Sequence, residues 1–395
     1  MADPLRILTL NSISSVGLKR LPAERYSVGT HVNSPDAILV RSHDMHAIEI
    51  APSVKAIGRA GAGTNNIPVA AMNQRGVPVF NAPGANANAV KELVIAGILL
   101  AARNLVAAIR FVDGLSGADE QISKAVEDGK KHFTGVELPQ HVLGVIGLGK
   151  IGSLVADAAI KLGMNVYGYD PEITVDAAWS LPSQVRKAHS IEEVMRNSDF
   201  VTIHVPLLDQ TRDLIEAKRI SLMKHGAVLL NFSREGIVDN DAVLRALEAK
   251  RLKAYVCDFP SNSLQGRSGV VALPHLGAST REAEDNCAVM VVEQVRDYLE
   301  NGNVRNAVNF PDVTMMRESP YRLGIANANV PNMVGQISTA VARAGLNIHN
   351  MLNKSKQDIA YTLVDVDSAV PLNVIDRIAA IEGVLAVRYL PSEAS

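Results

Sequence analysis

The clearest chemical signal in this 395-residue sequence is a glycine-rich loop with a defined context. Gly147, Gly149 and Gly152 form a G-x-G-x-x-G pattern directly after the apolar run 142–146, and apolar residues recur at helical spacing after it. The first glycine permits a tight turn, the second lets the backbone approach a diphosphate, and the third lets the helix pack against the strand. A turn without a ligand would also account for three glycines, but the flanking strand and helix favour a dinucleotide site at the helix N-terminus.

An acidic residue ends the next apolar run. Asp170 follows residues 166–169 and lies roughly 20 residues beyond the first glycine, where dinucleotide-binding folds place a ribose-binding acid. Its carboxylate can accept hydrogen bonds from both ribose hydroxyls and would repel a 2′-phosphate. The cofactor that this pattern predicts is therefore NAD rather than NADP.

Three polar segments further along the chain could carry a reaction. They are residues 231–236, 258–262 and 274–280, and the first two follow expected strands, at the edge where open α/β sheets bind ligands. Arg234 could grip a carboxylate in a bidentate fork. His275 could take or return a hydroxyl proton while a hydride moves to or from nicotinamide. A surface arginine and a core histidine are the alternatives, and the combination with the glycine-rich loop favours catalysis.

The glycine-rich loop and these segments together closely resemble the D-isomer-specific 2-hydroxyacid dehydrogenases, over nearly the whole chain. Arg234 matches the substrate-carboxylate arginine of that family, and His275, in Pro-His-x-Gly-x-Ser-Thr, matches its acid/base histidine. The members that the chain resembles most oxidise 3-phospho-D-glycerate to 3-phosphohydroxypyruvate with NAD, the first step of serine synthesis. The resemblance implies that reaction. One alternative is the same chemistry on glycerate, lactate or 2-hydroxyglutarate, and another is a dinucleotide-sensing, corepressor-like binding protein.

The resemblance also implies the remaining site residues. The loop 58–66 resembles the one whose backbone amides hold the substrate carboxylate, and Arg59 would bind the 3-phosphate. The residues implied in substrate binding are Arg59, Ala60, Gly61, Ala62, Gly63, Asn86, Asn88, Arg234 and His275. Those implied in cofactor binding are Gly147, Gly149, Lys150, Ile151, Gly152, Asp170, His204, Val205, Pro206, Thr211, Phe232, Ser233, Arg234, Asp258, His275 and Gly277. No histidine has ligand spacing with a second candidate, so we expect no metal site.

One position departs from the family pattern. The family places a glutamate beside the histidine, and Asn262 stands there in this sequence. An amide can hold the imidazole ring by a hydrogen bond but cannot supply the charge. We therefore count Asn262 with Arg234 and His275 as a catalytic candidate, and a nearby acid such as Asp258 is the alternative partner. Asp258 is also a candidate ligand of the nicotinamide amide.

Composition narrows the classes of partner. The 39 basic and 41 acidic residues give a formal net charge of −2 without a basic run, which argues against nucleic acid. The longest apolar run, residues 93–102, is shorter than the roughly 20 residues of a membrane span. The start of the chain lacks a basic signal-peptide segment, and Cys257 and Cys287 form no disulfide framework. We expect a cytoplasmic protein that acts on a small phosphorylated 2-hydroxy acid.

Short apolar runs alternate with longer amphipathic segments up to about residue 300, which is typical of parallel sheets covered by helices. We expect an α/β protein with two Rossmann-like, doubly wound domains. A discontinuous substrate-binding domain would comprise residues 1–90 and 274–310, because His275 must face a cleft between the domains, and residues 91–273 would form the NAD-binding domain. Strands are expected at 5–10, 37–40, 54–57, 77–80, 142–146, 166–169, 200–204, 227–231 and 254–258, and long helices at 87–110 and 279–300.

A polar linker at residues 301–320 precedes a small C-terminal module, residues 320–395, with a β-α-β-β-α-β order typical of ferredoxin-like folds. Its strands are expected at 321–326, 346–353, 359–366 and 384–390, its helices at 333–344 and 372–381, and a disordered tail at 391–395. The module resembles an ACT domain. In serine-inhibited relatives two asparagines and a histidine form the pocket; Asn329 and Asn347 match, whereas Asn327 replaces the histidine. L-serine as an effector and dimerisation through edge strands without a ligand both stay open.

The family forms dimers through the helix near residues 87–110 and the loop after it. The resemblance therefore implies a homodimer or homotetramer. Lys130, Lys131 or His132 would then reach the active site of the partner.

Overall fold

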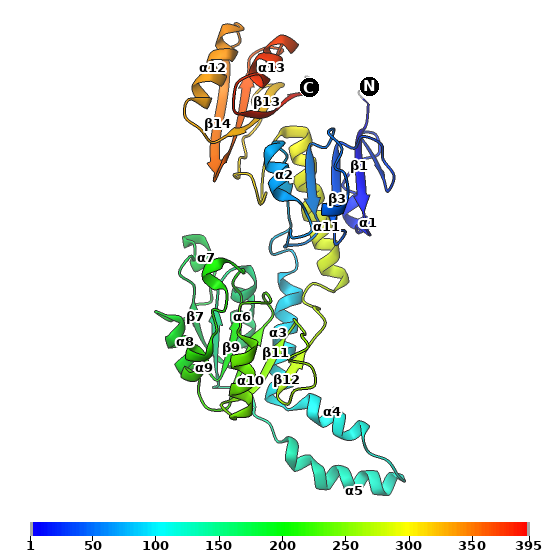
Figure 1. Cartoon of the computed structure of the whole chain (residues 1–395), viewed down its shortest axis with the longest axis vertical. Helices are drawn as coiled ribbons and strands as arrows, with labels where there is room; N and C mark the ends of the chain where they lie inside the picture. The colour runs from blue at the N-terminus through cyan, green and yellow to red at the C-terminus, as the bar shows by residue number, and fades with distance from the viewer. Residues whose placement is uncertain (1–2, 393–395) are drawn as a thin grey trace. The chain divides into compact units, whose positions relative to one another are not determined.

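The computed structural model describes residues 3–392, apart from the side chain of Asp176, and divides the chain into two compact units (Figure 1). Unit 1 comprises Met1–Asn86 and Arg281–Ser395, and unit 2 comprises Ala87–Thr280. The chain crosses between the units after Asn86 and after Thr280, within a few residues of the predicted domain boundaries at 90 and 274. The C-terminal module belongs to unit 1.

Unit 1 contains a five-stranded parallel sheet with the order β2-β1-β3-β4-β5. Alternate residues of β3 face opposite sides of the sheet. Leu39 packs in a cluster with Val291 of α11 (Arg281–Asn301), whereas Ile38 packs in a second cluster with Met72 of α2 (Val69–Gln74). The other elements are β1 (Leu5–Leu10), α1 (Ser15–Leu18), β2 (Tyr26–Gly29), β3 (Ala37–Val40), β4 (Ala56–Arg59) and β5 (Val79–Phe80).

The C-terminal module has the predicted β-α-β-β-α-β order and an antiparallel sheet with the strand order β14-β15-β13-β16. One face of the sheet packs on its two helices. The other packs on Tyr298 of α11 and Phe310 of the linker through residues such as Tyr361. The elements are β13 (Tyr321–Ala328), α12 (Met333–Arg343), β14 (Ile348–Lys356), β15 (Ile359–Val366), α13 (Leu372–Ala379) and β16 (Val384–Pro391).

Two expectations for this module need correction. β14 begins and ends later than predicted, because Gly345 adopts a positive φ in the turn before it and the polar residues 353–356 pair with β15. Pro391 belongs to β16 rather than to a disordered tail, and residues 393–395 of that tail lie outside the described residues.

Unit 2 contains a seven-stranded parallel sheet with the order β12-β11-β10-β9-β6-β7-β8. Its strands are β6 (Val142–Ile146), β7 (Asn165–Tyr169), β8 (Arg186–Lys187), β9 (Phe200–Ile203), β10 (Ala227–Asn231), β11 (Leu252–Cys257) and β12 (Val270–Ala272). Its helices are α3 (Ala87–Ala102), α4 (Leu105–Asp113), α5 (Asp119–Gly129), α6 (Lys150–Lys161), α7 (Val175–Trp179), α8 (Ile191–Asn197), α9 (Ala217–Leu222) and α10 (Asn240–Glu248). The doubly wound α/β fold predicted from the sequence is confirmed.

The single helix predicted over residues 87–110 is wrong. Asn104 has φ of +52°, a left-handed conformation that asparagine tolerates, and this residue separates α3 from α4. Among the described residues no single helix is long and apolar enough to cross a membrane; α3 and α4 satisfy the criterion only together, across a bend of 66°.

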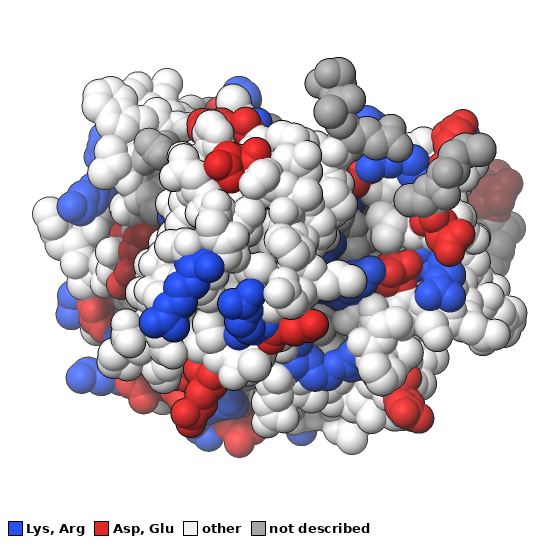
Figure 2. All heavy atoms as spheres, turned by 90° about the horizontal axis from the view of Figure 1, so that it is seen from above, with Lys and Arg blue, Asp and Glu red and all other residues white. Residues whose placement is uncertain are grey.

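The charged surface agrees with the balanced composition. Figure 2 shows acidic and basic side chains interspersed over the face that it presents.

Candidate active site

The glycine-rich loop joins β6 to α6, and two of its three glycines are required by contacts within the chain. Gly147 has φ of +90°, and a Cβ added there would lie 2.6 Å from the carbonyl oxygen of His204. A Cβ on Gly152 would lie 1.9 Å from the carbonyl oxygen of Gly147, so this glycine lets the helix pack against the loop. A Cβ on Gly149 would meet no atom within 4 Å. The loop therefore presents open backbone at the N-terminus of α6, where Lys150 and Ile151 are the first residues.

Asp170 follows β7 and is held against this loop. One carboxylate oxygen accepts a hydrogen bond from the backbone N–H of Leu148 at 2.8 Å, and the other from the N–H of Glu172 at 3.0 Å. Each oxygen has a further lone pair for a ligand. The contact with Leu148 fixes the carboxylate relative to the glycine-rich loop.

His204 follows β9, the strand beside β6; the residue is part-buried and the Nδ1 atom of its ring is fully buried. Burial lowers the pKa of its imidazole to about 3, so the ring is neutral at physiological pH. Its Nε2 lies 3.0 Å from the hydroxyl of Thr202, and its Nδ1 has no hydrogen-bond partner within residues 3–392. The backbone N–H of His204 donates to the carbonyl of Ile146 at 2.7 Å. His204 thus supports the strand end from which the glycine-rich loop departs.

The loop after β9, residues 204–211, and the turn after β10, residues 232–236, meet beside this strand end. The hydroxyl of Ser233 donates a hydrogen bond to the carbonyl of Val205. The hydroxyl of Thr211 donates a hydrogen bond to the carbonyl of Pro206 at 2.6 Å, which closes the loop of residues 204–211 on itself. The structure therefore brings Val205, Pro206, Thr211 and Ser233 together within unit 2.

Arg234 is exposed at the end of β10. The side-chain amide of Asn231 donates to the carbonyl of Arg234 at 3.0 Å and its oxygen accepts from the N–H of Ser233 at 3.1 Å, so the turn is fixed from within. Phe232 anchors it, since the ring packs against Gly97 of α3. The guanidinium of Arg234 bonds to the carbonyl of Ser233 and forms no ion pair in the described part of the chain.

Asp258 holds the segment that carries His275. Its buried carboxylate accepts hydrogen bonds from the N–H of Leu276 at 2.7 Å and of Gly277 at 2.9 Å. Burial raises the pKa of the Asp258 carboxyl, while these two bonds and the charge of His275 act in the opposite direction. His275 is exposed, and its φ of +53° is a left-handed conformation that turns the backbone between Leu273 and Leu276.

Asn262 does not hold the imidazole ring. It is exposed, and no hydrogen bond joins it to His275 among residues 3–392. The ring of His275 instead meets that of Phe259 edge-on, with centroids 5.2 Å apart. Phe259 was not among the sequence candidates; its place two residues after the end of β11, beside Asp258, is the signal that could have indicated it.

The substrate candidates of unit 1 lie on the loop after β4. Gly61 has φ of +150°, and a Cβ there would lie 1.6 Å from Nη1 of Arg59, so the guanidinium of Arg59 folds over a position that only glycine allows. The N–H of Ala60 donates to Val40 at 2.8 Å. The amide of Asn81, which sequence reasoning missed, donates to the carbonyl of Ala62 at 2.6 Å.

The remaining substrate and effector candidates are dispersed. Asn86 belongs to unit 1 and its Oδ1 is buried without a partner in the described residues, whereas Asn88 belongs to unit 2 and donates to Glu92 at 2.8 Å. Asn327 pairs with the start of β15, next to Asn329, while Asn347 lies beside the end of β15. This separation is roughly 20 Å at the rise of a strand, so the three asparagines form no common pocket within one chain.

Comparison with known proteins identifies the family. A family model described as "D-isomer specific 2-hydroxyacid dehydrogenase, NAD binding domain" matches residues 103–277. The chain is 36% identical over 341 residues to D-3-phosphoglycerate dehydrogenase of Methanocaldococcus jannaschii, an alignment that covers 83% of this chain and 62% of the relative. It is 33% identical over 356 residues to the enzyme of the same name from Haemophilus influenzae, with 87% of this chain and 83% of the relative covered. The chain belongs to the D-isomer-specific 2-hydroxyacid dehydrogenase family.

A solved structure agrees with this family. The chain resembles NAD⁺-bound 3-phosphoglycerate dehydrogenase of Entamoeba histolytica with a TM-score of 0.60 and 25% identity, over 78% of this chain and 99% of the other. The chain spans about three fifths of the length of the Methanocaldococcus jannaschii relative.

Unit 2 fits the cofactor that a 2-hydroxyacid dehydrogenase of this family uses. The open backbone at Gly149 and the carboxylate of Asp170 are the features that a diphosphate and an adenosine ribose require. NAD is thus the cofactor of this chain. Among residues 3–392 no group of three His, Cys, Asp or Glu side chains could hold a metal ion.

Proposed function

We propose that this chain oxidises 3-phospho-D-glycerate to 3-phosphohydroxypyruvate with NAD, the first step of serine synthesis. The observation that carries the proposal is the guanidinium of Arg59, which lies over Gly61 in the loop proposed to hold the substrate. An unphosphorylated 2-hydroxy acid would not need this cation. The names of the relatives at 33% and 36% identity support the same substrate.

The proposed chemistry divides between the two units. The backbone of Ala60–Gly63 and the guanidinium of Arg234 hold the substrate carboxylate, and Arg59 holds the phosphate. His275 takes the proton of the C2 hydroxyl, and when NAD is bound its nicotinamide accepts the hydride that leaves C2. Phe259 and Asp258 orient His275, Phe259 by ring contact and Asp258 through the adjoining backbone.

The test uses the reverse reaction. We expect 3-phosphohydroxypyruvate to be reduced with a far lower KM than hydroxypyruvate, and Arg59→Gln to raise the KM for the phosphorylated substrate roughly 10- to 100-fold. Arg343→Gln, which removes an exposed arginine from α12, is the matched control and should change neither KM. Equal KM values for the two substrates would favour another 2-hydroxy acid, such as glycerate, lactate or 2-hydroxyglutarate.

The second candidate, a dinucleotide-sensing binding protein, predicts NAD binding with negligible turnover. The exposed position of His275 beside Phe259 favours catalysis instead. His275→Gln should abolish turnover while calorimetry still detects NAD. Wild-type protein that binds NAD but reduces none of the candidate keto acids would support the binding protein.

We also propose the domain roles predicted above. Residues 1–90 with 274–310 bind substrate, residues 91–273 bind NAD, and residues 320–395 form an ACT domain. The strand order of the C-terminal sheet supports the last assignment. Because its asparagines are separated within one chain, an L-serine site would need residues of a second copy. Calorimetry with L-serine, beside its effect on turnover, tests this role, and absence of both responses would remove it.

Dimerisation through unit 2 is the oligomeric state we propose. α4 leaves Leu105, Ile109 and Val112 exposed on one face, which a second copy could cover. Lys130, Lys131 and His132 are exposed beyond it and would reach the partner. Sedimentation of wild type and Ile109→Glu tests this, and an unchanged mass would contradict it.

A further inference from the structure

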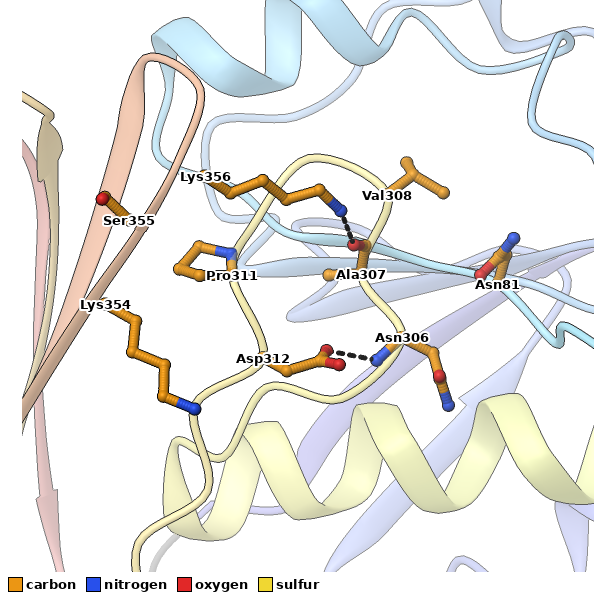
Figure 3. Close-up of a pocket in the computed structure, with 9 residues that line it drawn as sticks. All are labelled: Asn81, Asn306, Ala307, Val308, Pro311, Asp312, Lys354, Ser355 and Lys356. Carbon is orange, nitrogen blue, oxygen red and sulfur yellow. Dashed lines mark hydrogen bonds between the residues drawn. The ribbon is translucent and has the colours of Figure 1, made fainter. Parts of the chain in front are cut away.

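A cavity of about 580 Å³ lies within unit 1, apart from the proposed substrate loop. Three segments line it: Asn81 after β5, the linker from Asn306 to Asp312, and the end of β14 from Lys354 to Lys356 (Figure 3). This volume is within the range of pockets that bind small metabolites. None of the proposed catalytic or cofactor residues lines it.

The cavity receives two positive charges from one strand. Lys354 and Lys356 are two residues apart on β14 and therefore share a face of the strand. Figure 3 shows both side chains extending from the β14–β15 hairpin towards the linker. The ammonium group of Lys356 donates to the carbonyl of Ala307 at 3.0 Å, and neither lysine has an acidic partner within 4.0 Å in the described part of the chain.

One carboxylate also lines the cavity. Asp312 accepts a hydrogen bond from the backbone N–H of Asn306 at 2.8 Å, so it is already engaged with the linker. The lining therefore keeps an excess of one positive charge, together with the amide donor of Asn306 and the hydroxyl of Ser355. Two ammonium groups and neutral donors suit a ligand with two negative charges.

A chain of hydrogen bonds connects the cavity with the substrate loop. Lys356 bonds to Ala307 of the linker, and the neighbouring carbonyl of Asn306 accepts the backbone N–H of Asn81 at 3.3 Å. The side-chain amide of Asn81 then donates to the carbonyl of Ala62 at 2.6 Å. A ligand that shifts Lys356 and the linker would therefore displace the loop that contains Arg59.

We propose that this cavity binds a small dianion, such as a phosphate or a dicarboxylate, and that the bound anion changes substrate affinity through Asn81. The ligand neutralises Lys354 and Lys356 together. Because Asn81 contacts both the linker and Ala62, the effect reaches the substrate loop without a contact between ligand and substrate.

Calorimetry without NAD or substrate tests binding by itself. Inorganic phosphate and succinate are titrated separately into wild type, Lys354→Gln/Lys356→Gln, Arg59→Gln and Lys19→Gln. We expect the double variant to lose affinity for at least one probe by about tenfold or more, whereas Arg59→Gln and the exposed control Lys19→Gln retain it. The better probe identifies the anion class. Equal affinity of wild type and the double variant for both probes would overturn the proposal.

Kinetics test the coupling, and this part rests on the proposed function. The better probe should change the KM of the wild type for 3-phosphohydroxypyruvate severalfold, and the change should vanish in the double variant. Asn81→Ser should still bind the anion in calorimetry but lose its effect on KM. If the anion instead competed with the substrate at the substrate site, it would raise the KM of wild type, the double variant and Asn81→Ser equally. That result would contradict the coupling. Absence of all turnover would refute the proposed function and leave the calorimetric result standing.

Discussion

The carboxylate of Asp258 accepts a hydrogen bond from the backbone N–H of Leu276 at 2.7 Å, and Leu276 directly follows His275. A buried acid at the end of β11 thus fixes the segment that carries the proposed proton acceptor. The bond to Gly277 at 2.9 Å adds a second fixed point. In the proposed reaction Asp258 would act as a positioning residue, through the backbone that follows His275.

Asp258→Asn should reduce kcat. The asparagine oxygen can accept one of the two N–H groups, but its own NH₂ would face the other, and a lost bond of this kind costs about 1–3 kcal/mol. We expect kcat to fall about tenfold or more, with little change in the KM for the phosphorylated substrate. Asp209→Asn, at an exposed residue of unit 2, is the control. A variant with wild-type kcat would show that the two bonds do not position His275.

Asn262→Glu should shift the pH dependence of turnover. Position 262 lies three residues after Phe259, whose ring contacts the imidazole, and a negative charge there would favour the protonated imidazole through space, so the acidic limb of the oxidation profile should move to higher pH. The profile is measured as kcat against pH, and Asn262→Gln, which keeps the amide, should leave it in place. If both variants keep the wild-type profile, position 262 lies too far from His275 to influence its charge.

His204 should weaken the fold in acid. Burial lowers the pKa of its imidazole to about 3, whereas the unfolded chain protonates near pH 6.5. Above pH 6.5 the ring is neutral in both the folded and the unfolded chain, so its burial adds no pH dependence. Between pH 6.5 and the folded pKa only the unfolded chain binds the proton, and the free energy of unfolding falls by roughly 1.4 kcal/mol per pH unit. Urea unfolding followed by circular dichroism at pH 7 and pH 5 should therefore show a steeper loss for wild type than for His204→Gln. The exposed His31→Gln should keep the wild-type slope, and equal slopes in all three proteins would contradict a buried neutral ring.

Arg322 and Asp365 form a completely buried ion pair in the C-terminal module, with N–O distances of 2.6 and 2.8 Å. Arg322 also donates to the carbonyls of Asn301 and Met315, which ties the sheet to the linker. Removing one partner leaves an uncompensated buried charge, so Asp365→Asn should destabilise the protein by about 3–5 kcal/mol.

Hydrogen exchange shows where Asp365→Asn destabilises the protein. We expect the backbone amides of the linker and of β13 to exchange faster than in the wild type. Asp376→Asn, on the exposed side of α13, is expected to leave exchange unchanged. Wild-type protection in Asp365→Asn would mean that the linker is held by other contacts.

The glycine-rich loop, Asp170 and the order of strands and helices could be predicted from the sequence because each depends on neighbouring residues. Gly147 and Gly152 are required by local sterics, and the period of the apolar residues distinguishes helix from strand. The edge strands β2, β8 and β12 were missed, since short strands with few buried residues carry little periodic signal.

Contacts between distant segments were decided only by the tertiary structure. Asp258 reaches the backbone after His275 because β11 ends beside that segment, and no pattern near Asn262 could show that Phe259 would meet the imidazole ring instead. The separation of Asn327 from Asn347 follows from the register of β15. Likewise Lys354 and Lys356 are ordinary polar residues in the sequence, and only the tertiary packing within unit 1, of the C-terminal sheet against the linker, places them in one cavity with Asn81.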